Sequence, residues 1–179
     1  FFAKIPVRTG YRGEMRFGIV NNRKRLDHEI LKQTVQRFTA LGYREELKAP
    51  PTIYQPVLTI DVANREWFIK DANLKMNKQV IAFMPGAEYG EAKRWPTKYY
   101  RQLAEMLVSN DYRIWILGSD KEKETGKLIS DDYEEDVINL CGKTKLEDVI
   151  DLLSVVHLAV SNDSGLMHIA CAAGAKVIG

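Results

Sequence analysis

The stretch VIAFMPGAEYGEAKRWP, residues 80–96, joins an uninterrupted apolar run to a loop of a different composition. The run, residues 80–84, lacks the alternation of a half-exposed strand, so it predicts a strand that is covered on both faces. The loop after it holds two glycines, two acids and two adjacent bases. Glycine lets backbone approach a ligand closely and bases attract anions, so this junction predicts a phosphate-binding loop.

The same kind of strand recurs along the rest of the chain. Further apolar runs occupy residues 113–118, 137–142, 158–162 and 176–179, and helical segments separate them. Strands that alternate with helices at this spacing are parallel and are joined by right-handed crossovers. The pattern predicts an α/β fold, with a doubly wound, Rossmann-like parallel sheet in residues 79–179. Ligands of such sheets bind at the carboxyl ends of the strands.

The first part of the chain is less regular. Residues 1–26 are rich in Gly, Asn and Arg, and Asp27 is expected to cap a helix over residues 28–41. The segment APPTIYQP, residues 49–56, favours extended backbone because of its X-Pro steps. We expect a domain boundary between residues 49 and 71. The chain would then hold part of an N-terminal α/β domain (1–60), a linker (61–78) and a C-terminal domain (79–179).

Composition excludes several classes of protein. With 45% hydrophobic and 28% charged residues, the chain is an ordinary globular sequence, and no apolar run approaches the ~20 residues of a membrane span. The net charge of +2 conceals a basic front, because residues 1–50 carry 11 Lys/Arg against 5 Asp/Glu. That front either meets an anionic partner or is simply a solvated surface. Nucleic acid is disfavoured because aromatic residues are not interleaved with the bases.

A second loop, SNDSGLMH at residues 161–168, also follows a predicted strand. The free N–H groups and the dipole of a helix that starts at Ser164 and Gly165 form an anion site. His168 lies one turn further, and Asp163 beside an anion site suggests contact with hydroxyl groups of a ribose or a sugar. Alternatively, Asp163 or Ser164 is a plain helix cap and His168 an ordinary helix-face residue.

In the first loop, the candidates are Gly86 for close approach and Lys93 for charge, unless Lys93 and Arg94 are only a surface pair. The loop is neither a Walker A loop nor a GxGxxG loop. HExxH, GxSxG and paired CxxC motifs do not occur, and the three histidines are too scattered to indicate a metal. The sequence therefore predicts no metal site.

Four segments together resemble the ADP-heptose:lipopolysaccharide heptosyltransferases of glycosyltransferase family 9, and the first loop is most similar to the heptosyltransferase II branch. They are PGAEYGEAKRWP, ILGSDKEKE, SNDSGLMHIACAAGAKVIG and, near the start, IPVRTGYRGEMRFGIVN. The resemblance implies a two-domain GT-B fold. An inner-core lipopolysaccharide acceptor docks on the first domain and ADP-heptose mainly on the second. Transfer inverts the anomeric centre, needs no cofactor and takes place at the cytoplasmic face of the inner membrane; Mg²⁺ is not indicated.

The resemblance also assigns roles to residues. Lys93 and Asp163 are its candidates for catalysis, with Lys93 on the donor phosphates and Asp163 facing the heptose and ribose. The other implied contacts are, for the donor, Gly86, Ser119, Thr144, Ser164, Gly165 and His168, and for the acceptor, Arg12 and Arg16. Thr144 would line the adenine pocket, whereas the register of Ser119 and Asp120 near the ribose stays open.

The chain departs from the family at both ends. The family begins with a strand, a Gly-rich loop and a catalytic Asp, and continues past the final VIG; neither part is present here. We therefore expect a piece of a longer protein that lacks the general base and is inactive alone. Two alternatives stay open: a related heptosyltransferase with another acceptor, and a non-catalytic nucleotide-binding module.

Overall fold

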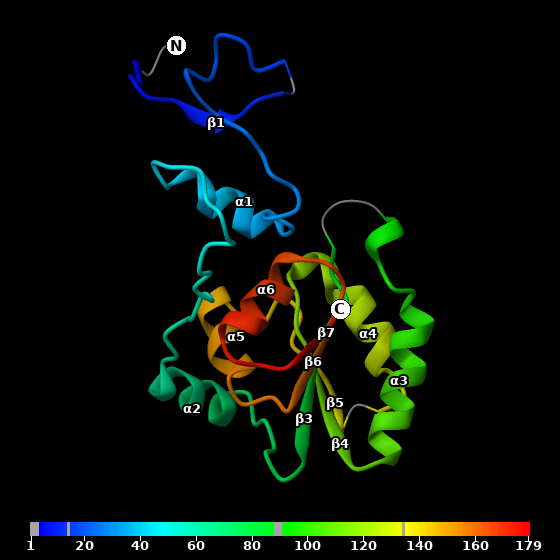
Figure 1. Ribbon diagram of the computed structural model, residues 1–179. Helices are drawn as coiled ribbons and strands as arrows, with labels where there is room; N and C mark the ends of the chain where they lie inside the picture. The colour runs from blue at the N-terminus through cyan, green and yellow to red at the C-terminus, as the bar shows by residue number, and fades with distance from the viewer. Residues whose placement is uncertain (1–3, 14, 88–90, 134) are drawn as a thin grey trace. The chain divides into compact units, whose positions relative to one another are not determined.

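The structure is a computed structural model and describes residues 4–13, 15–87, 91–133 and 135–179 (Figure 1). The chain divides into two compact units, unit 1 (Phe1–Gln55) and unit 2 (Pro56–Gly179). The division falls in the segment APPTIYQP, where the X-Pro steps keep the backbone extended.

Unit 2 is built on a parallel sheet of five strands in the order β5-β4-β3-β6-β7. Their bounds are β3 Gln79–Met84, β4 Tyr112–Ile116, β5 Val137–Asn139, β6 Leu158–Ser161 and β7 Val177–Ile178. Ile81 of the central strand β3 pairs with Ile114 on one side and with Leu158 on the other. The chain first builds the sheet outward through β4 and β5 and then returns to the other side of β3, which confirms the predicted doubly wound topology.

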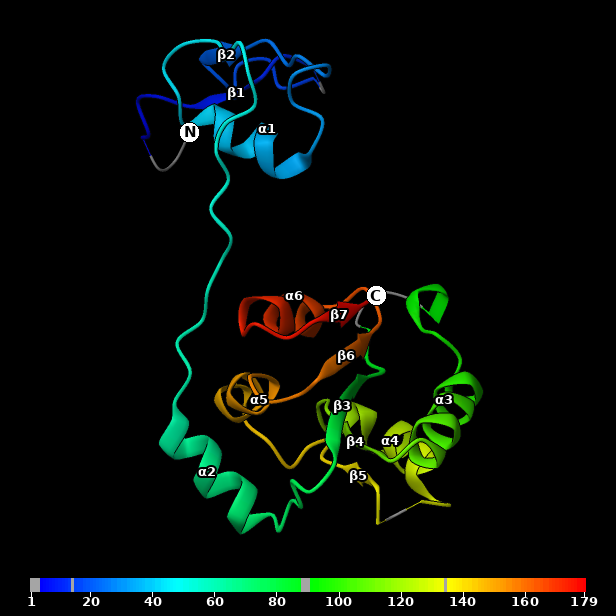
Figure 2. The ribbon, with the colours of Figure 1, turned by 60° about the horizontal axis from the view of Figure 1, so that its bottom comes forward.

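Helices cover both faces of this sheet (Figure 2). They are α2 Val62–Asp71, α3 Thr97–Ser109, α4 Lys123–Ser130, α5 Leu146–Leu153 and α6 Gly165–Ala172, with short 3-10 helices at Glu91–Lys93 and Asp120–Glu122. On one face Phe83 packs with Tyr100 of α3 and Ile129 of α4. On the other face Trp115 packs with Leu152 of α5 and its neighbours. Successive side chains of one strand point to opposite faces, so continuous apolar strands supply both cores.

Residues 61–78, expected as a linker, are folded into unit 2. Asp61 caps α2 by accepting a hydrogen bond from the Asn64 N–H (3.0 Å). The Asp61 N–H and the Asn64 amide in turn donate to the carboxylate of Asp151 on α5 (2.8 and 2.9 Å). Phe68 of α2 is buried in the core. The sequence of α2 is mostly polar and therefore does not indicate that the helix packs on unit 2. One buried aromatic residue and a few hydrogen bonds attach it.

The start of α5 lies one residue later than a capping-box pattern in the sequence would place it. The sequence favours a capping box from Thr144 to Glu147, but α5 begins at Leu146 and its cap is Lys145. The Asp148 carboxylate accepts a hydrogen bond from the Lys145 N–H (2.8 Å). The shift leaves the hydroxyl of Thr144 out of the cap.

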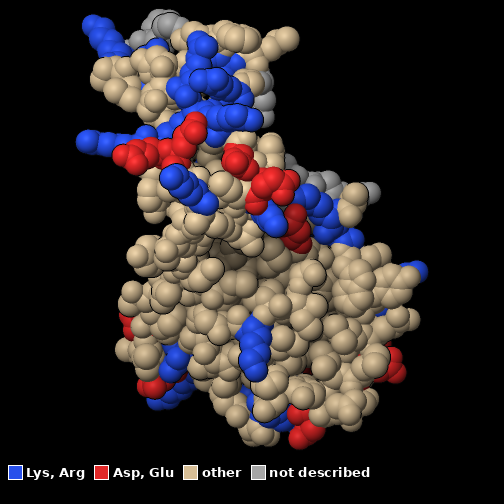
Figure 3. Space-filling view, in the orientation of Figure 1, with Lys and Arg blue, Asp and Glu red and all other residues tan. Residues whose placement is uncertain are grey.

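Unit 1 contains the parallel pair β1 Thr9–Tyr11 and β2 Asn22–Lys24 and the helix α1 Thr34–Leu41. The helix expected over residues 28–41 is thus shorter by its first turns. Asp27 does act as a cap, accepting from the N–H groups of Glu29 and Ile30, but for an isolated turn. Phe38 of this helix is 70% exposed. In Figure 3, Lys and Arg side chains gather over unit 1, while much of the visible side of unit 2 is uncharged.

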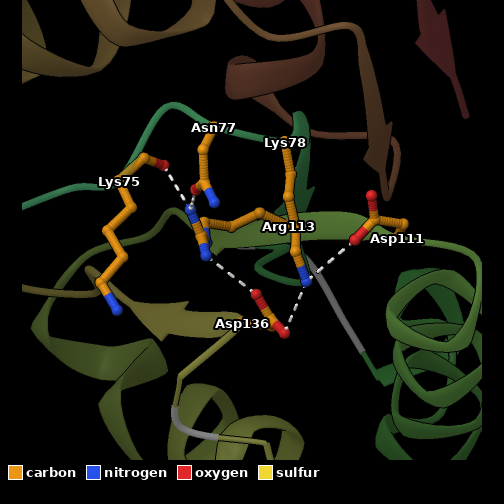
Figure 4. A network of polar contacts seen from close by, with 6 residues as sticks. All are labelled: Lys75, Asn77, Lys78, Asp111, Arg113 and Asp136. Carbon is orange, nitrogen blue, oxygen red and sulfur yellow. Dashed lines mark hydrogen bonds and ion pairs between the residues drawn. The ribbon is translucent and has the colours of Figure 1, made fainter.

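A buried arginine network closes the amino-terminal edge of the sheet (Figure 4). Arg113 of β4 is 3% exposed. Its guanidinium donates to the Lys75 carbonyl (2.6 Å), to Asn77 Oδ1 (2.7 Å) and to Asp136 Oδ1 (2.9 Å). The network joins the segment before β3 to β4 and to the residue before β5.

Lys78 adds a second cation to this network. Its Nζ lies 3.0 Å from Asp136 Oδ2 and 3.2 Å from Asp111 Oδ1. Burial alone raises the pKa of Asp136, but hydrogen bonds from Lys78 and Arg113 outweigh it and the pKa lies below its ordinary value of 3.8. The ionised carboxylate therefore stabilises the fold above pH 3.8, and this stabilisation is lost as the pH falls through the lowered pKa.

We predict that Asp136→Asn lowers the free energy of unfolding by about 2 kcal/mol at pH 7, because charge-assisted hydrogen bonds to a buried guanidinium are weakened. Urea denaturation of the two chains measures the difference, which should narrow as the pH falls below 3.8. Asp111→Asn is the control: its side chain is exposed, so its ion pair with Lys78 should contribute little. An Asp136→Asn difference that is as large at pH 2 as at pH 7 would contradict this role of the carboxylate.

Candidate functional site

The carboxyl ends of β3, β4, β5 and β6 open into one pocket of about 460 Å³ within unit 2. It lies where the sheet reverses its strand order beside β3, the position at which doubly wound sheets bind ligands. The described residues that line it are Gly86, Ala87, Lys93, Gly118, Ser119, Glu122, Thr144, Lys145, Leu146, Val149, Asp163, Ser164, Gly165, Leu166 and Ile169.

Most of the predicted donor residues lie in this wall. Those that the structure brings together are Gly86, Lys93, Ser119, Thr144, Asp163, Ser164 and Gly165. His168 is exposed on α6 and is not a lining residue, although it is near enough to affect the pKa of Asp163. Arg12 and Arg16 are exposed residues of unit 1. The roles of all these residues stay predictions.

Lys93 and Asp163 form an ion pair across the pocket wall. Lys93 Nζ lies 2.7 Å from Asp163 Oδ2, although 70 residues separate them in the chain. The hydrogen bond and the charge of Lys93 hold the pKa of Asp163 below its ordinary value. Both side chains are about half exposed, at 49% and 64%. Solvent screens such a pair, so an incoming anion can compete with the carboxylate for the lysine.

The start of α6 has the features of an anion site. Ser164 is extended (φ −144°, ψ 171°), and its side chain makes no hydrogen bond that caps the helix. The observed partner of Asp163 is Lys93. Ser164 is thus the N-cap residue of α6 by position, but its side chain does not cap the helix. A Cβ built on Gly165 meets nothing within 4 Å, so the space beside the helix start is open. Free N–H groups and the positive end of the helix dipole favour an anion there.

Part of the pocket lining is apolar, and the lining also includes one buried polar atom without a partner in the described part of the chain. Leu146 and Val149 of α5 face the pocket together with Leu166 and Ile169 of α6. The Thr144 hydroxyl is buried, and among the described residues no partner satisfies it. A buried hydroxyl without a partner is costly unless a ligand or water bonds it. An apolar slot with one hydrogen-bonding group suits a flat heteroaromatic ring.

Sequence reasoning missed Glu122, a carboxylate in the pocket wall. It accepts hydrogen bonds from the Ser119 N–H (2.9 Å) and the Ser119 hydroxyl (2.6 Å). A Cβ on Gly86 would lie 3.1 Å from its side chain, and one on Gly118 would lie 2.9 Å from it. Both glycines thus make room for Glu122. The available signal was the S-x-x-E spacing of a capping box in ILGSDKEKE.

The apolar lining was missed for another reason. Leu146, Val149, Leu166 and Ile169 stand at positions where amphipathic helices normally bury core residues, so the pattern gives no separate signal. In the loop whose register was left open, Ser119 lines the pocket, whereas Asp120 pairs with Lys123.

Two absences hold for the described part of the chain. It contains no group of three or more His, Cys, Asp or Glu side chains that could hold a metal ion. Nor does any helix within it have the length and apolarity that crossing a bilayer requires.

Known proteins resemble the chain over nearly its whole length. Lipopolysaccharide heptosyltransferase 2 of Salmonella typhimurium is 38% identical over 181 residues, which cover 96% of this chain and 52% of that protein. Lipooligosaccharide heptosyltransferase 2 of Haemophilus influenzae is 38% identical over 99% of this chain and 54% of its own length. The chain thus spans about half the length of the curated relatives it matches.

A solved structure gives the same result. The solved structure of Escherichia coli ADP-heptose lps heptosyltransferase II superposes with a TM-score of 0.79 at 35% identity, over 98% of this chain and 56% of that one. The sequence pattern of glycosyltransferase family 9 (heptosyltransferase) matches residues 1–179. The chain therefore belongs to glycosyltransferase family 9, the heptosyltransferase family.

Proposed function

We propose that the whole protein transfers heptose from ADP-L-glycero-D-manno-heptose to inner-core lipopolysaccharide, with inversion, as heptosyltransferases of the second type do. The observation that carries the proposal is the pocket, whose lining combines apolar side chains, a carboxylate and the start of a helix that favours anions. A nucleoside diphosphate has matching parts: a base, a ribose and a pyrophosphate. The names and identities of the relatives support ADP-heptose as the donor and lipopolysaccharide as the acceptor.

In this proposal the adenine lies against Leu146, Val149 and Ile169, and one of its edges bonds the free Thr144 hydroxyl. The Glu122 carboxylate, held by Ser119, accepts hydrogen bonds from the ribose hydroxyls. The pyrophosphate reaches the start of α6 at Ser164 and Gly165. Lys93 then exchanges part of its contact with Asp163 for the phosphates.

Transfer breaks the bond between the anomeric carbon and a phosphate oxygen while an acceptor hydroxyl attacks the opposite face. Negative charge grows on the departing ADP and positive charge on the sugar. Lys93 and the N–H groups of α6 stabilise the former, and the carboxylate of Asp163, freed from Lys93, faces the latter. The proton of the acceptor hydroxyl goes to a base, and no pocket residue is assigned that role.

The proposal also places the acceptor and the domains. Residues 1–60 belong to the acceptor domain and residues 79–179 to the donor domain, with α2 added to the latter by its contacts with α5. The exposed Arg12 and Arg16 meet carboxylates or phosphates of the lipopolysaccharide core. The reaction takes place at the cytoplasmic face of the inner membrane and needs no metal cofactor. His168 supports the pyrophosphate site from its outer side.

We expect the 179-residue chain to bind ADP in preference to GDP and UDP, because the slot beside Thr144 selects the base. Isothermal titration calorimetry of the three nucleotides measures this. Preference for GDP or UDP would point to a glycosyltransferase with another donor. A folded chain that binds none of them would overturn the assignment of this pocket to the donor.

We predict that Lys93→Ala weakens ADP binding by about ten- to a hundredfold, because a charge-assisted hydrogen bond contributes about 1.5–3 kcal/mol. The whole enzyme should lose turnover by a similar factor. Lys98→Ala is the matched control, since Lys98 lies over the Tyr99 ring and does not line the pocket. Equal ADP affinity of the Lys93→Ala and Lys98→Ala chains would remove Lys93 from the site.

We predict that Gly165→Ala keeps or slightly raises stability but weakens ADP binding. Its Cβ meets no protein atom within 4 Å, and alanine is favoured over glycine in a helix by about 0.5–1 kcal/mol. The new methyl group would occupy the open space that a pyrophosphate needs. Thermal unfolding and calorimetry of the same sample separate the two effects, and unchanged ADP affinity would argue against this anion site.

A further inference from the structure

Asn162, the residue after β6, has no role in the function proposed above, yet its side chain bonds both ends of the first loop. It is 5% exposed. Its Nδ2 donates to the Pro85 carbonyl (2.6 Å), and its Oδ1 accepts from the Trp95 N–H (3.0 Å). Pro85 directly precedes Gly86, and Trp95 stands two residues after Lys93. One amide group thus spans the described part of the loop from end to end.

The backbone of Asn162 is itself fixed to the sheet. Its N–H donates to the Met84 carbonyl at the end of β3 (3.3 Å), and its carbonyl accepts from the Ser161 hydroxyl (2.8 Å). The side chain therefore projects from a rigid point. A contact held this way transmits the position of β6 to the loop after β3.

A buried amide at this point is not explained by packing. Removing an amide from water is unfavourable unless its groups are bonded, and an apolar side chain would suit a buried strand end better. Both groups of the Asn162 amide are bonded, and their two shorter bonds go to the loop, while Tyr100 of α3 makes a longer contact with Oδ1. Their effect is to fix the distance between the loop and the start of α6.

Lys93 is the charged residue that this arrangement positions. From one side Asn162 holds Trp95, and from the other side the next residue, Asp163, pairs with Lys93 itself. Arg94 braces the same loop independently by donating to the Ala87 carbonyl (3.2 and 3.0 Å). Arg94 therefore links the two described parts of the loop to each other, whereas Asn162 links them to the end of β6.

We propose that Asn162 is a positioning residue for the donor pyrophosphate: it aligns Lys93 with the start of α6 without touching the ligand. This deepens the proposed function and rests on it. Its consequence is an energetic coupling between Asn162 and Lys93 in nucleotide binding. A residue that only stabilised the fold would show no such coupling once the chain is folded.

A double-mutant cycle on the 179-residue chain tests the proposal, with ADP affinity measured by calorimetry. Asn162→Ala should weaken ADP binding by about tenfold. Without Asn162, Lys93 is misaligned and should lose about the contribution of one hydrogen bond between a charged group and the pyrophosphate. In the Lys93→Ala background the same substitution should change affinity by less than about twofold. Tyr100→Phe is the matched control: it removes a 3.4 Å contact to the same Oδ1 and leaves both loop bonds, so affinity should stay unchanged.

The outcomes separate this inference from the function on which it rests. If the unmodified chain binds ADP and Asn162→Ala binds it equally well, the positioning role is wrong and the donor site stands. A tenfold loss that persists in the Lys93→Ala background would also overturn the role, since the two residues would then act independently. If the unmodified chain binds no nucleotide, both proposals fail.

A second variant guards against loss of folding. Asn162→Asp keeps an oxygen for the Trp95 N–H but loses the donor to the Pro85 carbonyl. Thermal unfolding is recorded for every variant, and if Asn162→Ala does not unfold cooperatively, Asn162→Asp takes its place in the cycle. The expected pattern is the same: Asn162→Asp should lower ADP affinity less in the Lys93→Ala chain than in the chain that keeps Lys93.

Discussion

The pairing of β3 with β6 is the contact on which the pocket depends. Phe83 lies opposite Val160 and Met84 opposite Ser161, so both strands end at the same level of the sheet. The loop that carries Lys93 and the turn that carries Asp163 therefore leave the sheet side by side. Parallel pairing is possible here because three helical crossovers separate the two strands in sequence, and those helices supply the apolar cover that a parallel sheet requires.

Two ion pairs at opposite edges of this sheet show how burial determines what a charge does. Arg113 and Asp136 have side chains that are 4% and 21% exposed, and the other terminal nitrogen of the guanidinium donates to the Lys75 carbonyl and to Asn77. Separating them would leave a buried charge unpaired, so the pair serves the fold. Lys93 and Asp163 are about half exposed and can separate at little cost, which leaves the lysine available to a ligand. The same chemical pairing is structural at one edge and exchangeable at the other.

The sequence predicts those parts of the structure that local patterns determine. Continuous apolar runs predicted the parallel sheet. Residues after β3 and β6 could be predicted as pocket residues because the carboxyl ends of parallel strands lie at the same end of a sheet. What the sequence could not supply depends on contacts between distant segments. Helix α2 is attached through Phe68 and Asp151, the latter some ninety residues from Asp61. Asn162 reads as the end of a strand, and its two bonds to Pro85 and Trp95 become visible only in three dimensions.

Several local departures from ordinary protein structure meet in the pocket. The Thr144 hydroxyl is buried without a partner in the described part of the chain, the first turn of α6 has no side-chain cap, and Gly165 leaves open space in a helix. Each departure lowers stability slightly, and in a protein selected only for its fold each could be removed by a single substitution. Related unpartnered atoms on Arg113 and Trp115 lie outside the pocket, so an orphaned atom alone identifies nothing. What distinguishes the pocket is that a hydroxyl, a set of N–H groups and an exchangeable lysine all face one space, and a single ligand with a base and a pyrophosphate could satisfy them together.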